Sequence, residues 1–94
     1  MSKELYKEAI DLFGINNQLK KFREEMLECL LALERYMNDK SLDKDALKSE
    51  IADVRITLSQ AEMILFANDR EKNHWINKKQ NKLRKHIMES RGEE

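Results

Sequence analysis

The sequence predicts an all-α protein, and two observations carry that expectation. The chain of 94 residues has no proline and only two glycines, residue types on which tight turns and strand connections depend. Apolar side chains recur at spacings of three and four, which is the period of one helix face. We expect a single domain, residues 1–94, with an antiparallel helical hairpin as its core. A domain this small has a thin core, so self-association is expected as well.

The first helix is predicted from about Lys3 to Phe13. Ser2 is a suitable N-cap, because its hydroxyl can accept a hydrogen bond from a free backbone N–H of the first turn. Gly14 stands where a helix often ends in a positive φ. This short helix is expected to cover one end of the core.

The second helix is predicted from about Asn17 to Asn38, with Asn16 as its N-cap. Its expected core stripe consists of Ile15, Leu19, Phe22, Met26, Leu30, Leu33 and Met37. The polar stretch Asp39–Asp45 is predicted to form the loop that follows this helix.

The third helix is predicted from about Lys44 to Phe66, capped by Ser41 or Asp43. Its expected core stripe consists of Leu47, Ile51, Val54, Leu58, Ala61 and Leu65. Both long helices carry further apolar residues outside their stripes, namely Leu27, Leu31, Ala52, Ile56 and Met63. A lone hairpin would leave these residues in water, so they are expected to contact other helices or a partner subunit.

A fourth helix is predicted to end near Glu89, because Asn68 and Glu71 have the spacing of a capping box. Its main candidates for burial are Trp75, Ile76, Leu83 and Ile87. The helix is strongly basic: residues 70–91 carry eight basic and two acidic side chains, whereas residues 1–69 carry 10 basic and 14 acidic ones. The zero net charge of the chain therefore hides an acidic body followed by a basic helix.

Two acidic pairs lie beside the expected core stripes. Glu25 and Glu28 are three residues apart on the second helix, and Glu50 and Asp53 are three apart on the third. Composition alone produces about as many such pairs as the sequence has, so their number is not informative. Their position is informative, since at 100° per residue Glu25 and Glu50 border the stripes instead of lying opposite them.

In an antiparallel hairpin these pairs also lie at similar heights, so that Glu28 faces Glu50 and Glu25 faces Asp53. Four converging carboxylates repel one another unless a cation lies between them. Oxygen ligands of this kind suit Mg²⁺ or Mn²⁺. From the residues alone, a metal site and two solvated helix faces both stay open.

The run Glu24-Glu25-Met26-Leu27-Glu28, then 21 intervening residues, then Glu50-Ile51-Ala52-Asp53-Val54, resembles the EExxE…ExxD signature of the MazG-like all-α nucleoside triphosphate pyrophosphohydrolases. The resemblance extends over about Gly14 to Ile87 and is strongest to short forms carried by phages and Gram-positive bacteria. It implies a four-helix bundle, assembled as a homodimer or a dimer of dimers, that hydrolyses a (deoxy)nucleoside triphosphate to the monophosphate and pyrophosphate with Mg²⁺.

The same resemblance assigns roles to single residues. Its metal ligands would be Glu25, Glu28, Glu50 and Asp53, and Glu24 would orient or deprotonate water. Gln18 matches a position that contacts the nucleotide. Two cations of the fourth helix, Lys79 and Lys82, are candidates to stabilise the leaving pyrophosphate. Cys29 and Arg55 differ from the family pattern. Neither difference removes a predicted metal ligand, but Arg55 leaves the identity of the substrate open.

Other classes of protein fit less well. No apolar run is long enough to span a bilayer, the first residues do not resemble a signal peptide, and one cysteine forms no internal disulfide, so the expected location is the cytoplasm. An acidic body with few aromatic residues argues against a dedicated nucleic-acid binder. The competing hypothesis is a non-catalytic helical interaction module, for example a phage regulator that keeps the fold.

Overall fold

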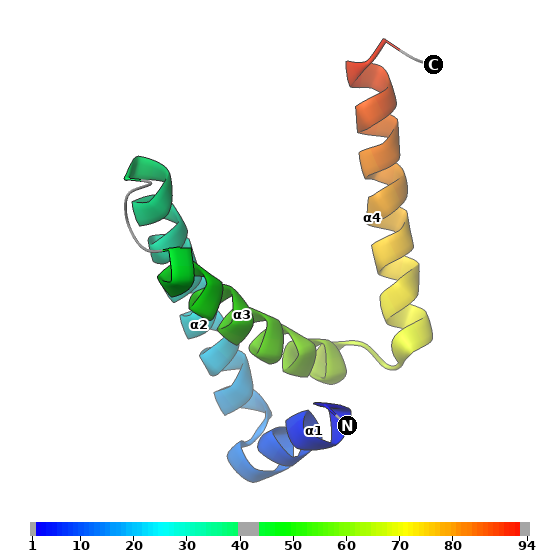
Figure 1. Cartoon of the computed structure of the whole chain (residues 1–94). Coiled ribbons are helices and arrows are strands. Elements are labelled where there is room, and N and C mark those ends of the chain that lie inside the picture. Colours follow the sequence, from blue (N-terminus) through cyan, green and yellow to red (C-terminus); the bar gives the residue numbers. More distant parts are fainter. Residues whose placement is uncertain (1, 40–43, 93–94) are drawn as a thin grey trace.

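Four α-helices make up most of the computed structural model, which describes residues 2–39 and 44–92 (Figure 1). They are α1 (Ser2–Phe13), α2 (Ile15–Asn38), α3 (Lys44–Leu65) and α4 (Asp69–Ser90). No strand occurs among these residues, so the prediction of an all-α fold is confirmed. None of the described helices is both long and apolar enough to cross a membrane.

The helix ends lie within two residues of the predicted ones, but their caps differ in part. Gly14 has a φ of 94°, as expected for the residue that ends α1. The same glycine is the N-cap of α2, so the prediction of Asn16 as the cap was wrong. The side chain of Asn17 donates a 2.8 Å hydrogen bond to the carbonyl oxygen of Phe13, which gives one of the last carbonyls of α1 a partner. Ser2 is the first residue of α1 instead of its cap, and Ser41 and Asp43 lie outside the described residues.

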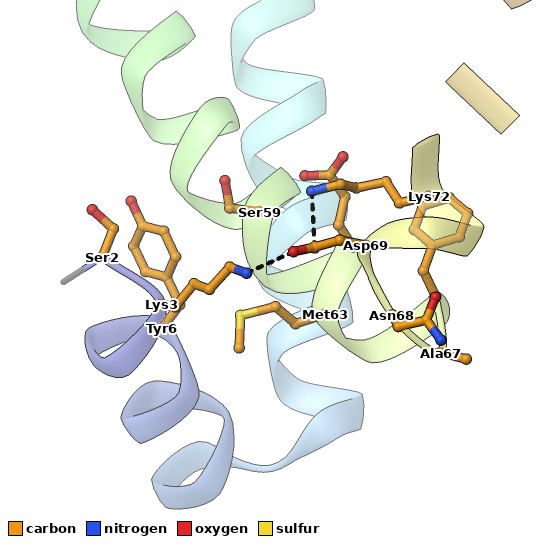
Figure 2. A pocket seen from close by; sticks show the side chains of 11 residues that line it. Ser2, Lys3, Tyr6, Ser59, Met63, Ala67, Asn68, Asp69 and Lys72 are labelled. Carbon is orange, nitrogen blue, oxygen red and sulfur yellow. Dashed lines mark hydrogen bonds and ion pairs between the residues drawn. The ribbon is translucent and has the colours of Figure 1, made fainter. Parts of the chain in front are cut away.

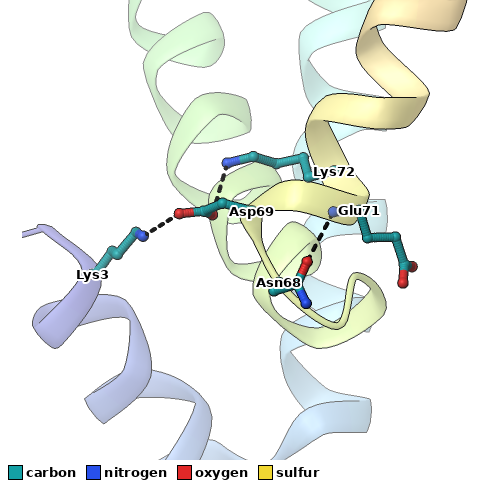
Figure 3. A network of polar contacts seen from close by, with 5 residues as sticks. All are labelled: Lys3, Asn68, Asp69, Glu71 and Lys72. Atoms are coloured by element: carbon teal, nitrogen blue, oxygen red, sulfur yellow. Dashed lines mark hydrogen bonds and ion pairs between the residues drawn. The ribbon is translucent and has the colours of Figure 1, made fainter.

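The start of α4 is capped as its sequence predicts. The side chain of Asn68 accepts a 2.9 Å hydrogen bond from the backbone N–H of Glu71 (Figure 3). One free N–H of the first turn is thereby satisfied, which is the role of an N-cap asparagine.

The α2–α3 hairpin is the centre of the molecule, and α1 packs across its lower end against both helices (Figure 1). The faces that meet are rotated by a little less than one residue from the predicted stripes. On α2 the inward face runs through Phe22, Glu25, Cys29, Ala32 and Tyr36, while Met26, Leu30 and Met37 stay exposed. Small side chains at the contact allow two helices to approach closely, which favours this rotation.

The same rotation occurs on α3. Its inward face runs through Glu50, Val54, Thr57 and Ala61, whereas Ile51, Leu58 and Leu65 are exposed. Ala61 is the one fully apolar residue that is deeply buried among those described, at 2% exposure. A single copy of the chain therefore has a small core and leaves most of its large apolar side chains in contact with solvent.

Helix α4 stands apart from the hairpin (Figure 1). The radius of gyration of 16.8 Å exceeds the value of about 12 Å expected for a compact chain of this length. Trp75, Ile76, Leu83 and Ile87, which the sequence predicts to be buried, are all at least 41% exposed. The four-helix bundle implied by the family resemblance is thus not completed within one chain.

A small polar network fixes the first turn of α4 beside α1 (Figures 2 and 3). Lys3 of α1 lies 2.9 Å from the carboxylate of Asp69, and Lys72 lies 3.5 Å from the same group. The ammonium of Lys3 is the main reason why the pKa of Asp69 is lowered, and Lys72 contributes further.

A Lys3→Ala substitution is therefore expected to raise the pKa of Asp69 toward its ordinary value. Because Lys72 remains, the increase should be partial. Carboxyl-detected NMR titration of the aspartates measures this directly, with Lys48→Ala as a control that removes a lysine far from Asp69. An unchanged pKa of Asp69 would mean that the ion pair does not persist in solution.

Candidate metal centre

Three carboxylates converge at the middle of the hairpin. Glu25 projects from α2 toward α3 and is only 5% exposed, because it lies on the inward face of its helix. Glu28 lies one turn further along α2 at the edge of the interface, and Glu50 reaches in from α3 with a half-buried side chain. One carboxylate oxygen from each residue lies within 4.8 Å of the other two.

The electrostatics of this cluster are unfavourable without a cation. The Oε2 atoms of Glu25 and Glu50 are buried and have no hydrogen-bond partner among the described residues. Burial raises the pKa of Glu50, and the negative charges of Glu28, Asp53 and Glu25 raise it further. A buried carboxylate oxygen without a donor is costly, and a divalent cation would satisfy two of them at once.

The residues present fit a hard divalent cation. The donors are all carboxylate oxygens, they come from two rigid helices, and their spacing allows one ion to contact all three. The nearby cation is Lys21, whose ammonium lies 3.1 Å from Oε1 of Glu25. Its hydrogen bond to Glu25 raises the pKa of Lys21, so this lysine stays charged and neutralises part of the cluster.

A pocket of about 460 Å³ opens beside Glu25 and Lys21. The end of α1 closes it on one side with Ala9 and Phe13, and α3 contributes Asp53, Ile56, Thr57 and Gln60. Across its floor the side chain of Gln18 donates a hydrogen bond to the side chain of Gln60. The pocket therefore joins acidic and amide groups to an aromatic ring, within reach of the carboxylate cluster.

The predicted site residues are only partly brought together. Glu25, Glu28 and Glu50 converge, and Gln18 and Asp53 line the adjoining pocket. Asp53 is not one of the three residues whose oxygens meet, although it lines the pocket beside Glu25 and its charge raises the pKa of Glu50. Compared with the predicted stripe, the rotation of α3 turns both Glu50 and Asp53 toward α2, and Glu50 lies nearer the middle of the inward face.

The remaining candidates lie away from the cluster. Glu24 is exposed, and its carboxylate is 4.0 Å from the ammonium of Lys21. Lys79 and Lys82 are exposed on α4, which does not pack on the hairpin of its own chain. Neither lysine can therefore act with Glu25, Glu28 and Glu50 of the same copy in this arrangement.

Sequence reasoning missed three residues of the site. Gln60 and Thr57 are 5% and 6% exposed and lie on the inward face of α3, and Lys21 forms the ion pair with Glu25. The hydroxyl of Thr57 donates to the carbonyl oxygens of Asp53 and Val54 within its own helix, so it is satisfied there. The available signal was the spacing of 42 residues between two glutamines that flank the acidic pairs, which the hairpin brings opposite each other.

Comparison of the chain with protein-family models, with curated proteins and with solved structures gives no match in any of the three.

Proposed function

We propose that this chain is a Mg²⁺-dependent nucleoside triphosphate pyrophosphohydrolase, which converts a (deoxy)nucleoside triphosphate and water to the monophosphate and pyrophosphate. The observation that carries the proposal is the convergence of Glu25, Glu28 and Glu50, with two orphaned buried oxygens, beside a pocket of about 460 Å³. The resemblance of Glu24–Glu28 and Glu50–Val54 to the signature of MazG-like enzymes suggests the reaction. Mn²⁺ is the expected substitute, because it accepts the same ligands.

The role proposed for each residue follows from the position of its side chain. Glu25, Glu28 and Glu50 hold the metal, and Asp53 is the candidate fourth ligand. When bound, such an ion neutralises phosphate charge and lowers the pKa of a coordinated water. Glu24 is the proposed group that orients or deprotonates the attacking water. Its exposed position leaves it free to meet a substrate at the rim of the cluster.

Substrate contacts are proposed for Gln18 in the pocket and for Lys79 and Lys82 at the pyrophosphate. The lysines require a second copy of the chain, because their own helix stands away from the cluster. A homodimer or a dimer of dimers is therefore part of the proposal. The exposed apolar residues of α2, α3 and α4 support it, since surfaces of this kind mark interaction sites.

The experiment is an assay of pyrophosphate release against the eight common NTPs and dNTPs, run with Mg²⁺, with Mn²⁺ and with chelator. The proposal predicts release from at least one nucleotide with either metal and none with chelator. Release that persists in excess chelator, or no release from any nucleotide by a chain that binds the metal, would contradict the proposed reaction.

Gln60 offers a test of the pocket that is separate from the metal. Replacing it by alanine leaves the amide of Gln18 without its partner and opens the pocket floor. Gln18 then loses the partner that orients it toward the nucleotide. Because one hydrogen bond is worth about 0.5–1.5 kcal/mol, a KM increase of roughly 2- to 10-fold is expected, with a smaller change in kcat. Equal loss in a Ser59→Ala variant, which changes α3 outside this pocket, would show that the effect is not specific.

A non-catalytic interaction module is the second candidate, and the exposed apolar side chains of all four helices favour it. It predicts no turnover of any nucleotide, no stabilisation by Mg²⁺ or Mn²⁺, and a stable complex with another protein. The enzyme requires stabilisation by metal, because the cluster exists only in the folded chain. A thermal melt with and without metal therefore separates the two candidates.

A further inference from the structure

Helix α4 carries an apolar stripe that nothing in its own chain covers. Ile76, Leu83 and Ile87 share one side of the helix at 100° per residue, and Trp75 borders them. They are 41%, 57%, 41% and 45% exposed, respectively. A helix of this length is marginally stable in water without tertiary packing, so this stripe needs a partner surface.

The hairpin has an open apolar face of comparable length. At 100° per residue, the exposed apolar residues of α2 and of α3 fall on the same side of the antiparallel pair. We call this surface the open hairpin face; its members are Met26, Leu30, Leu33, Met37, Ile51, Leu58 and Leu65, and each is at least 39% exposed. Glu28 and Asp53 fall on the other side, where α1 packs.

The α4 of the same copy is held away from this face. Only Phe66–Asn68 separate α3 from α4, and the first turn of α4 is tied to α1 through Lys3 and Asp69 (Figures 2 and 3). Lys3 also lines the pocket of about 370 Å³ that α1 forms with the end of α3. This contact lies on the α1 side of the hairpin, so covering the open hairpin face from within the chain requires breaking it.

Length and charge both point to a second copy of this chain as the partner. Helix α4 has 22 residues, as does α3, and α2 has 24, so the stripe can run along the whole hairpin. Residues 70–91 carry eight basic and two acidic side chains, against 10 basic and 14 acidic in residues 1–69. Opposite net charges favour the encounter of α4 with the body of another copy.

We propose that two copies exchange their fourth helices, so that the stripe of each α4 packs on the open hairpin face of the other copy. The exchange covers both apolar surfaces of both chains, whereas a dimer formed through two hairpins alone would leave both α4 stripes in water. The inference specifies the proposed homodimer and does not depend on nucleotide hydrolysis. Because the open hairpin face lies opposite Glu28 and Asp53, contact of Lys79 and Lys82 with the pyrophosphate then requires the dimer of dimers. A failed exchange and a missing activity are therefore separate results.

The test uses sedimentation velocity on four full-length variants and the wild type. Leu83→Glu places a charge in the α4 stripe, and Met88→Glu places it about 120° around the same helix from the middle of that stripe. Leu30→Glu and Leu31→Glu are the matching pair on α2. All four side chains are at least 40% exposed in the single chain, so its own fold should persist, which far-UV circular dichroism checks.

Exchange predicts that the wild type is a dimer and that Leu83→Glu and Leu30→Glu each raise the dimer Kd by about 100-fold or more. Met88→Glu and Leu31→Glu should stay dimeric. An equimolar mixture of Leu83→Glu and Leu30→Glu should recover a heterodimer, because the intact α4 of one chain meets the intact hairpin of the other. Emission from Trp75 should shift to shorter wavelength on dimerisation.

Three results would overturn the exchange. If the Leu83→Glu variant is as dimeric as the wild type, the hairpins associate without α4. A wild type that is monomeric at all concentrations would mean that the apolar surfaces have another partner. Two dissociated variants that do not recover a dimer on mixing would mean that α4 does not pack on the hairpin of the other copy.

Discussion

A Glu50→Gln variant is expected to lose at least about 100-fold in the rate of pyrophosphate release. Glu50 contributes one of the three converging carboxylates, and its Oε2 is one of the two buried oxygens without a donor. Glutamine keeps the size of the side chain but removes the charge that holds a divalent cation. The measurement is the pyrophosphate assay at saturating metal and nucleotide.

The matched control is Glu34→Gln, which makes the same chemical change on the outer side of α2. It should keep full activity, because Glu34 is exposed and far from the cluster. Full activity in the Glu50→Gln variant would remove the metal-site assignment. Lost activity in both variants would point to a general effect of charge on the chain.

The same substitution should stabilise the metal-free protein. The pKa of Glu50 lies above its ordinary value of 4.5, because burial and the neighbouring carboxylates oppose its ionisation. The folded chain therefore keeps this proton at a pH where the unfolded chain has lost it. The free energy of unfolding accordingly falls as the pH rises from 4.5 through the raised pKa of the folded chain.

Thermal melts in chelator should thus show a higher Tm for Glu50→Gln than for the wild type above this pH window. Saturating Mg²⁺ should reverse the order, raising the wild-type Tm by about 10 °C at 100 times Kd and leaving the variant almost unchanged. A metal-free variant that is less stable than the wild type would mean that the carboxylates of the cluster do not repel one another in solution.

The helices and their ends were the most predictable part of the fold. Apolar spacing, the absence of proline, Gly14 and the cap by Asn68 are local signals, and each acts through a few neighbouring residues. Asn16 was a wrong prediction because the glycine before it ends one helix and begins the next. Nothing in the identity of Asn16 reveals that the chain turns one residue earlier.

The facing of the helices was harder to predict. Both α2 and α3 have apolar residues over more than half of their circumference, so the pattern defines no single inward direction. The hairpin chooses the side with Cys29, Ala32 and Ala61, and this choice buries Glu25 and Gln60 and exposes Leu30 and Leu58. Close approach of two backbones depends on side-chain size at both helices together, which a one-helix pattern does not contain.

The closeness of the acidic residues was predictable, but the set of residues whose carboxylate oxygens converge was not. Spacing and height along the hairpin predicted that Glu28 faces Glu50 and that Glu25 faces Asp53, and the structure brings oxygens of Glu25, Glu28 and Glu50 within 4.8 Å of one another. How close Asp53 and Lys21 lie to the cluster depends on the rotation of the helices, by less than one residue, from the predicted stripes. No local pattern in the sequence predicts the detached position of α4, with Lys79 and Lys82, or the exposed ion pair of Lys3 and Asp69, which are 66 residues apart.

Binding of Mn²⁺ to the nucleotide-free chain, followed by the loss of the free-ion EPR signal, tests the central claim most directly. We expect the wild type to bind Mn²⁺, Mg²⁺ to compete with it, and Glu34→Gln to bind as the wild type does. The Glu50→Gln variant should leave the free-ion signal unchanged at the same protein concentration. Equal binding of Mn²⁺ by Glu50→Gln and wild type would contradict the assignment of Glu25, Glu28 and Glu50 as a metal site.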